Sequence, residues 1–191
     1  CTWVDLGGRL VEGELSRLAA VHNVRFVWMS PPNGTTSAGR NFASKDKPQL
    51  RTRALPDGIP GLTGDAEEAV RRENRVIANI SLIVNWCVSR GILWCLESPS
   101  SSLIWATSPF VALFDSSKLS FTECILDMCM HGGSRKKSVK LLHSPTLDSG
   151  PLRRTCDGSH AHAAFSATCG LGSSASQEEK RYPQLFCQRV A

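Results

Sequence analysis

The spacing of apolar residues predicts an alternation of helices and strands along this chain. Apolar side chains recur at helical spacing over 12–23 and 65–90. The runs 24–29 and 92–98 are β-branched and aromatic, with too little polar alternation for a sheet that is wet on one face. We therefore expect both runs to be strands buried on both sides, preceded by a further short strand over 2–6.

The long helix is bounded by residues that begin and end helices. Asp65 is placed to cap its first turn, with Glu68 three residues later as in a capping box. Gly91 supplies a stop, because glycine readily adopts the left-handed conformation that often closes a helix. These signals predict the helix that connects the strands over 24–29 and 92–98.

The second half of the chain has weaker patterns. We expect short helical turns over 101–117, a hairpin formed by 118–130 and 138–144, and an amphipathic helix from about 177 to 190. The segment 145–176 is rich in Ser, Gly and His and has no period. It is expected to be irregular, as is the long loop over 34–64.

This order of elements predicts one domain over 1–191 with an α/β fold. We expect a partial Rossmann-like sheet, mostly parallel, with helices on both faces and a C-terminal antiparallel hairpin. In such a sheet, ligands bind beyond the carboxyl ends of the parallel strands. A polar residue at a strand end is therefore a candidate for a functional role.

Three strand ends carry polar residues of this kind. Asp5 ends the first strand, and Glu97 lies at the end of the strand over 92–98. The strand between them runs into what we call the Pro-Pro turn, made of Ser30, Pro31, Pro32 and Asn33. A plain turn is the simple alternative, because Pro-Pro followed by Asn-Gly is ordinary turn chemistry.

Composition adds limits rather than a function. The 191 residues carry a net charge of +5, with 41% hydrophobic and 20% charged residues, as in an ordinary globular domain. This charge fits an anionic partner without requiring one. The apolar region 76–96 is interrupted by Asn79, Asn85, Arg90 and Gly91, so no membrane span is expected.

The cysteines indicate a reducing compartment. There are eight, at irregular spacings, and Cys87 and Cys95 lie in apolar runs where a free thiol behaves as a small hydrophobe. We therefore expect free thiols rather than a disulfide framework, and an intracellular location in the nucleus or the cytoplasm.

Two groups of residues offer thiolate and imidazole ligands that could bind zinc. They are Cys124 with Cys129, and Cys156 with His160 and His162. The spacings are not those of a zinc ribbon or finger, and an odd separation along a strand puts Cys124 and Cys129 on opposite faces. We therefore expect no metal site, with Cys156 and both histidines in a surface loop.

Basic residues gather in and around the hairpin turn. Arg135, Lys136, Lys137 and Lys140 lie there, and Arg40 lies in the long loop. They are candidates for contacts with nucleic-acid phosphates. Solvated charges on a hairpin are the simple alternative.

Several short motifs occur in the order found in one enzyme family. They read "SPPNGTTS", "LESPSSSLIW", "CMHGGSRKKSVKLL", "CDGSHAH" and "YPQLFCQRVA". In this order the chain resembles S-adenosylmethionine-dependent DNA methyltransferases, closest to a divergent cytosine-5 branch found in phages and in mobile elements of eukaryotic microbes. The resemblance covers nearly the whole chain and implies a Rossmann-like methyltransferase sheet, with S-adenosylmethionine as cofactor and DNA as partner.

The resemblance also implies roles for the strand-end residues. Asp5 would accept a hydrogen bond from the adenine amino group of the cofactor. The Pro-Pro turn would carry the nucleophile, and Glu97 would hold a cytosine, flipped out of the duplex, along its Watson–Crick edge. In this chemistry a thiolate adds to C6 of the base, and C5 then attacks the methyl group of the cofactor.

The chain departs from the family at three points. Asn33 stands at the position of the nucleophilic cysteine, and Ser98 follows Glu97 where the family has asparagine. The glycine-rich cofactor motif would precede Asp5, where we expect this chain to be truncated. The expected protein is a methyltransferase-like domain that is inactive and does not bind S-adenosylmethionine measurably.

Two other interpretations are open. The chain can be a nucleic-acid-binding or structural α/β module without catalysis. It can also be an amino-group DNA methyltransferase, in which Ser30 and a backbone carbonyl of the Pro-Pro turn hold the exocyclic amine of the base. That class has an aromatic residue where this chain has Asn33.

Overall fold

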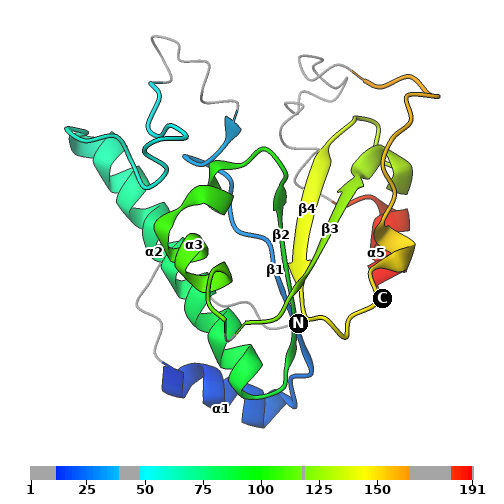
Figure 1. The fold of residues 1–191 in the computed structure, drawn as a ribbon, viewed down its shortest axis with the longest axis horizontal. Coiled ribbons are helices and arrows are strands. Elements are labelled where there is room, and N and C mark those ends of the chain that lie inside the picture. The colour runs from blue at the N-terminus through cyan, green and yellow to red at the C-terminus, as the bar shows by residue number, and fades with distance from the viewer. Residues whose placement is uncertain (1–11, 39–47, 118, 164–181, 191) are drawn as a thin grey trace.

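The computed structural model describes residues 12–38, 48–117, 119–163 and 182–190 (Figure 1). The strand expected over 2–6 lies outside the described residues, as do Asp5 and Arg40. The described part is a mixed α/β fold in which helices cover both faces of one sheet (Figure 1).

The sheet has four strands in the order β1-β2-β4-β3. β1 pairs with β2 in parallel, and β4 is antiparallel to both of its neighbours, β2 and β3. Consequently β1, β2 and β3 run in one direction and β4 runs in the other. The strand bounds are Phe26–Met29 for β1, Leu93–Pro99 for β2, Thr122–Asp127 for β3 and Ser138–His143 for β4.

The expectation of a mostly parallel sheet is wrong for the pairing, because β1 with β2 is the one parallel ladder among the described strands. The predicted hairpin is confirmed, but its second strand lies beside β2. β4 buries Val139, Leu141 and Leu142, whereas β3 leaves Glu123 and Ile125 exposed. A strand that is apolar on both faces is stabilised inside a sheet, and a partly charged strand suits its edge.

Helices lie on both faces of the sheet, as the sequence predicts. α1 (Glu12–His22), α2 (Gly64–Ser89) and α3 (Ser108–Phe114) pack on one face, and α5 (Gln184–Val190) packs on the other (Figure 1). Side chains along β2 alternate between the two faces of the sheet. Trp94 and Leu96 pack in the core under α1, α2 and α3, and Cys95 packs in the core under α5.

The long helix α2 begins and ends by different means. The prediction that Asp65 caps α2 is wrong, because Asp65 lies in the first turn and the N-cap residue is Thr63. Thr63 makes no side-chain cap hydrogen bond. The predicted stop is confirmed. Gly91 has φ of +64°, its N–H donates to Val88 O, and Ile92 N–H donates to Cys87 O, which is a Schellman motif.

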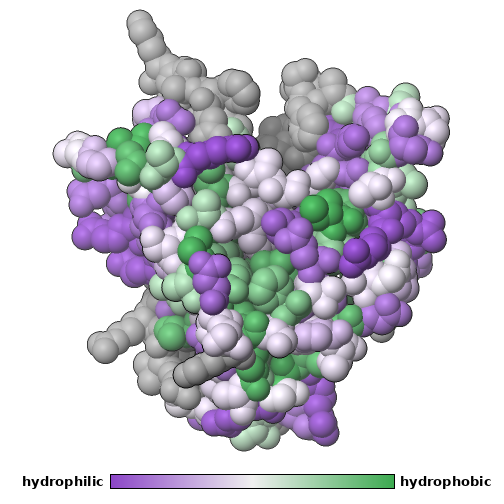
Figure 2. Space-filling model, in the orientation of Figure 1, coloured by the Kyte–Doolittle hydropathy of each residue, from purple (hydrophilic) through white to green (hydrophobic). Residues whose placement is uncertain are grey.

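The surface of α2 explains why this long helix is not a membrane span. Figure 2 shows polar residues over its outer side and apolar residues toward the centre of the same face of the molecule. Within the described ranges, no helix combines the length and the apolarity needed to cross a membrane.

Short helices and loops complete the described fold. The helical turns expected over 101–117 are confirmed by α3 and by the 3₁₀ helix η2 (Leu103–Ala106). Two further 3₁₀ helices follow the hairpin strands, η3 (Met128–His131) and η4 (Gly150–Leu152). Residues 48–63 contain no helix or strand, in agreement with the predicted loop. α5 begins at Gln184, after Pro183, and residues 177–181 lie outside the described part.

Candidate functional site

The parallel pairing of β1 with β2 brings the Pro-Pro turn to Glu97. Met29 lies opposite Leu96, so Ser30, which follows β1, and Glu97, the next residue within β2, are neighbours near the carboxyl end of the parallel pair. Ser30 Oγ donates a hydrogen bond to Glu97 Oε2 at 2.5 Å. The predicted convergence of Ser30 and Glu97 is confirmed for the described residues.

A tyrosine that sequence reasoning did not assign to the site completes the contacts of Glu97. Tyr182 donates its hydroxyl to Glu97 Oε2 at 2.7 Å, and Trp28 Nε1 donates to the Tyr182 oxygen at 3.3 Å. Burial, together with the negative charge of Glu97, raises the pKa of Tyr182. The phenol therefore stays protonated and remains a donor.

The second carboxylate oxygen of Glu97, Oε1, makes no hydrogen bond within the described part of the protein. Glu97 is 3% exposed, and its Oε1 has no hydrogen-bond partner among the described residues. Ser98, the residue that replaces the expected asparagine, is also buried, and its Oγ likewise lacks a partner in the described part. A buried carboxylate oxygen without a donor costs free energy, so this edge favours a ligand that supplies one.

Asn33 ties the Pro-Pro turn to the segment that follows β2. Its Oδ1 accepts a hydrogen bond from Ser102 Oγ at 2.7 Å and lies 3.0 Å from Thr36 Oγ1. Leu103 N–H also donates to Thr36 O at 2.9 Å. The side-chain oxygen of Asn33 is therefore engaged inside the protein.

A buried carboxylate from α2 holds the residues after the Pro-Pro turn. Glu73 accepts hydrogen bonds from Thr35 N–H at 2.5 Å, from Thr35 Oγ1, and from Thr36 Oγ1 at 2.8 Å. Sequence reasoning missed this role. The signal was a charged residue within the buried stripe of α2, on the same face as Val70 and Ile77.

A buried arginine supports the same threonine from the other side. Arg51 is 1% exposed, and its Nε donates to Thr35 Oγ1 at 2.7 Å. Its Nη1 donates to Pro56 O at 2.6 Å and to Asn74 Oδ1 at 2.8 Å. Burial lowers the pKa of Arg51, while the charges of Glu73 and Asp57 oppose that change. Arg51 and Glu73 thus fix the turn between them.

A second group of side chains meets near the end of β3, and we call it the Cys/His cluster. Its ligand atoms all lie within 4.8 Å of one another; its members are Cys129, Cys156, His160 and His162. The sequence-based reason for separating Cys129 from a site was wrong, because β3 ends at Asp127 and Cys129 lies on η3. Cys124 is buried within β3 and takes no part.

The basic residues of the hairpin turn differ in their accessibility. Arg135 is 6% exposed, which removes it from the surface, whereas Lys136 is exposed and Lys137 is half-buried. Lys140 forms an ion pair with Glu123 at 3.1 Å and lies over the Trp105 ring, 5.3 Å from its centroid. Lys136 and Lys137 therefore stay candidates for phosphate contacts.

A surface hollow beside α2 is separate from the Pro-Pro turn with Glu97 and from the Cys/His cluster. It has a volume of about 670 Å³ and is lined by residues that include Asp57, Val70, Arg75 and Ser108. None of its lining residues belongs to the Pro-Pro turn or to the Cys/His cluster, and Glu97 is not among them.

Comparisons of the chain with protein-family models, with curated proteins and with solved structures found no match. The assignment of a function therefore rests on the geometry of the sheet edge.

Proposed function

We propose that this chain is a cytosine-5 DNA methyltransferase-like domain that retains a base-binding edge and does not transfer a methyl group. The observation that carries the proposal is the state of Glu97. One carboxylate oxygen is fixed by the hydroxyls of Ser30 and Tyr182, and the other is buried with no donor among the described residues.

The Watson–Crick edge of cytosine suits such a carboxyl group. The 4-amino group donates a hydrogen bond, and N3 beside it accepts one from a protonated carboxyl. The base must leave the duplex to present this edge. Because Oε1 of Glu97 is itself buried, entry of a base requires a covering side chain to move. Tyr182 contacts the same carboxylate from the C-terminal segment, which makes it a candidate for that movement.

The described fold is compatible with a partial Rossmann-like methyltransferase sheet. A parallel strand pair delivers the Pro-Pro turn and Glu97 to one edge, helices cover both faces, and the sheet closes with an antiparallel hairpin. Open α/β sheets bind ligands at this edge.

We propose no site for S-adenosylmethionine on the described residues. Pro31 and Pro32 lack N–H groups, so the Pro-Pro turn cannot cradle a negatively charged group through those amides. Asp5, the residue expected to hold the adenine, lies outside the described part. No step through the cofactor is part of this proposal.

Contacts with DNA would come from basic side chains at the same edge. Asp127 N–H donates to Arg154 O at 2.8 Å, and Met128 N–H donates to Lys137 O at 2.9 Å. These bonds bring the exposed Arg154 and Lys136 to the carboxyl end of β3, which runs in the same direction as β2. Phosphate contacts of this kind would position a duplex without reading its sequence.

Replacing the asparagine by a nucleophile tests the proposal. The Asn33→Cys variant is expected to form a covalent adduct with a DNA duplex that carries 2-pyrimidinone in place of one cytosine. This base lacks the 4-amino group, so its C6 is attacked by a thiolate without any cofactor. The adduct is detected as a shifted band on a denaturing gel and by intact mass.

Two further proteins make the test specific. The unchanged chain, whose exposed Cys187 remains available, is expected to form no adduct. Adding Glu97→Gln to Asn33→Cys is expected to slow the adduct by roughly 10²-fold, as loss of a group that stabilises developing charge does. A folded Asn33→Cys variant that forms no adduct, or one that reacts equally well without Glu97, would refute the assignment.

The engagement of Asn33 favours a second candidate, a nucleic-acid-binding or structural module without base recognition. The Asn33 side-chain oxygen accepts from Ser102 Oγ, and Ser30 Oγ donates to Glu97, so both side chains make contacts within the fold. The contact with Ser102 engages the Asn33 oxygen, which disfavours an amino-group methyltransferase that would use it to hold an exocyclic amine. The second candidate is distinguished by DNA binding that does not depend on Glu97.

A further inference from the structure

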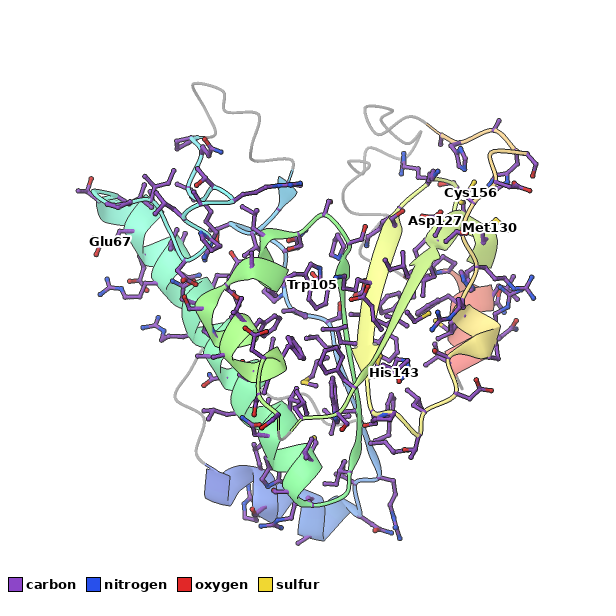
Figure 3. All side chains as sticks on the ribbon, in the orientation of Figure 1. Glu67, Trp105, Asp127, Met130, His143 and Cys156 are labelled. Carbon is purple, nitrogen blue, oxygen red and sulfur yellow. The ribbon has the colours of Figure 1, made fainter. Side chains whose placement is uncertain are left out.

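The Cys/His cluster joins two parts of the chain that the fold holds in place. Cys129 comes from η3, directly after β3, and Cys156 follows η4. His160 and His162 lie a few residues further along the same segment. Figure 3 shows Cys156, Asp127 and Met130 close together at the carboxyl end of β3.

The spacing of the ligand atoms fits a tetrahedral metal ion. Cys156 Sγ lies 3.4 Å from His162 Nε2 and 3.9 Å from His160 Nε2. Zinc bonds to sulfur and nitrogen at tetrahedral angles place such a pair about 3.5 Å apart. Because all four ligand atoms already lie within 4.8 Å of one another, small side-chain movements would close them around an ion.

Contacts outside the cluster fix the position of Cys156. Asp127, which is 4% exposed, accepts a hydrogen bond from Cys156 N–H at 2.7 Å through Oδ2 and from Ser138 Oγ through Oδ1. Ala163 N–H donates to Ser134 O at 2.9 Å, which anchors the far end of the segment on the hairpin turn. The segment is thus attached on both sides of its three ligands.

Two glycines allow the backbone to turn tightly next to Cys156 and Cys129. Gly158 N–H donates to Cys156 Sγ at 3.3 Å, and Gly158 has φ of +80°, which allows the turn back toward the sulfur. Beyond Cys129, a Cβ on Gly133 would lie 2.9 Å from Met128 O. Hydrogen bonds from backbone amides to a ligating sulfur are a common outer contact of metal sites.

We propose that Cys129, Cys156, His160 and His162 bind one zinc ion in a structural site. Two thiolates with two imidazoles are a ligand set typical of structural zinc, and the separation of Cys156 from His162 matches tetrahedral geometry. Four protein ligands leave no open position for a substrate, so the ion would link the 156–162 segment to η3 rather than catalyse a reaction. This site is independent of the proposed base-binding edge.

Cobalt(II) titration tests the site on the whole chain after reduction and removal of metals by a chelator. Cobalt is expected to give visible d–d bands and a sulfur-to-cobalt charge-transfer band that saturate at one equivalent, and zinc is expected to bleach them. Elemental analysis of protein purified without chelator is expected to find one zinc ion per chain. Removing that zinc is expected to lower the melting temperature.

Matched variants decide whether the bands report this cluster. Cys156→Ser is expected to weaken the charge-transfer band, because one of the two thiolates is lost. His160→Asn, which replaces an exposed ligand, is expected to weaken cobalt binding at least roughly 10²-fold, more than the loss of a residue that only contacts a ligand. Cys187→Ser, at an exposed cysteine on α5, is expected to change neither. No cobalt bands in the reduced unchanged chain would overturn the proposal, as would equal binding by the His160→Asn and Cys187→Ser variants.

Discussion

Glu73→Gln is expected to lower the free energy of unfolding by about 3 kcal/mol, because it breaks a buried, charge-assisted hydrogen-bond group. Glu73 accepts from Thr35 and Thr36, and an amide in its place turns two donor hydrogens toward groups that are themselves donors. The buried guanidinium of Arg51 also loses a nearby negative charge. Urea denaturation followed by circular dichroism measures the change.

The same substitution elsewhere on α2 provides the control. Glu68 is exposed and pairs with Arg71 at 2.7 Å and with Arg75 at 3.2 Å. These charges hold the pKa of Glu68 below its usual value. Since water and salt screen such surface pairs, Glu68→Gln is expected to leave stability unchanged within error. If Glu73→Gln and Glu68→Gln lowered the free energy of unfolding equally, the contacts of Glu73 with Thr35 and Thr36 would contribute no more to stability than a surface ion pair.

Phe186→Ala is expected to destabilise the protein by about 3–5 kcal/mol, the range for truncating a buried aromatic side chain. Phe186 is 1% exposed and packs its ring against Tyr182 at 5.1 Å, His131 at 5.7 Å and Trp28 at 5.9 Å between centroids. Its loss removes the main apolar contact that holds α5 on the sheet. Thermal and urea unfolding measure the effect, and proteolysis reports whether α5 is released.

The neighbouring residue offers a matched control for that truncation. Leu185 lies on the same helix and is 40% exposed, so Leu185→Ala removes a side chain without opening a buried cavity. Its expected effect is small. If Leu185→Ala destabilised the protein as much as Phe186→Ala, the packing of α5 through Phe186 would not be the cause.

The sequence predicted the elements and the edge at which strands deliver polar residues. The apolar runs over 24–29 and 92–98 lack polar alternation, and both are strands in the parallel pair. Local pattern could not predict which hairpin strand lies beside β2. That choice depends on the burial of β4 against two helical layers, which is a property of the assembled fold.

The site was predicted only where its residues lie at or near the ends of strands. Ser30 and Glu97 were found in this way, whereas Tyr182 lies 85 positions from Glu97 and its contact depends on the packing of α5. The Cys/His cluster was missed for a local reason. The apolar residues after Asp127 predict a continuing strand, but the chain turns there into η3, with Gly132 at φ of +91°.

The central claim is that Glu97 recognises a cytosine outside the duplex. It is tested by titrating the chain with two fluorescent duplexes that differ only in whether one cytosine faces guanine or an abasic site. The unchanged chain is expected to bind the unpaired cytosine at least about tenfold more tightly, since a hydrogen bond from its 4-amino group to the unpartnered Oε1 is worth ~1.5–3 kcal/mol. Glu97→Ala is expected to remove this preference, and Glu123→Ala, which deletes the same charge from the exposed face of β3, is expected to keep it. Equal binding of the two duplexes by the unchanged chain, or a preference that survives Glu97→Ala, would contradict the claim.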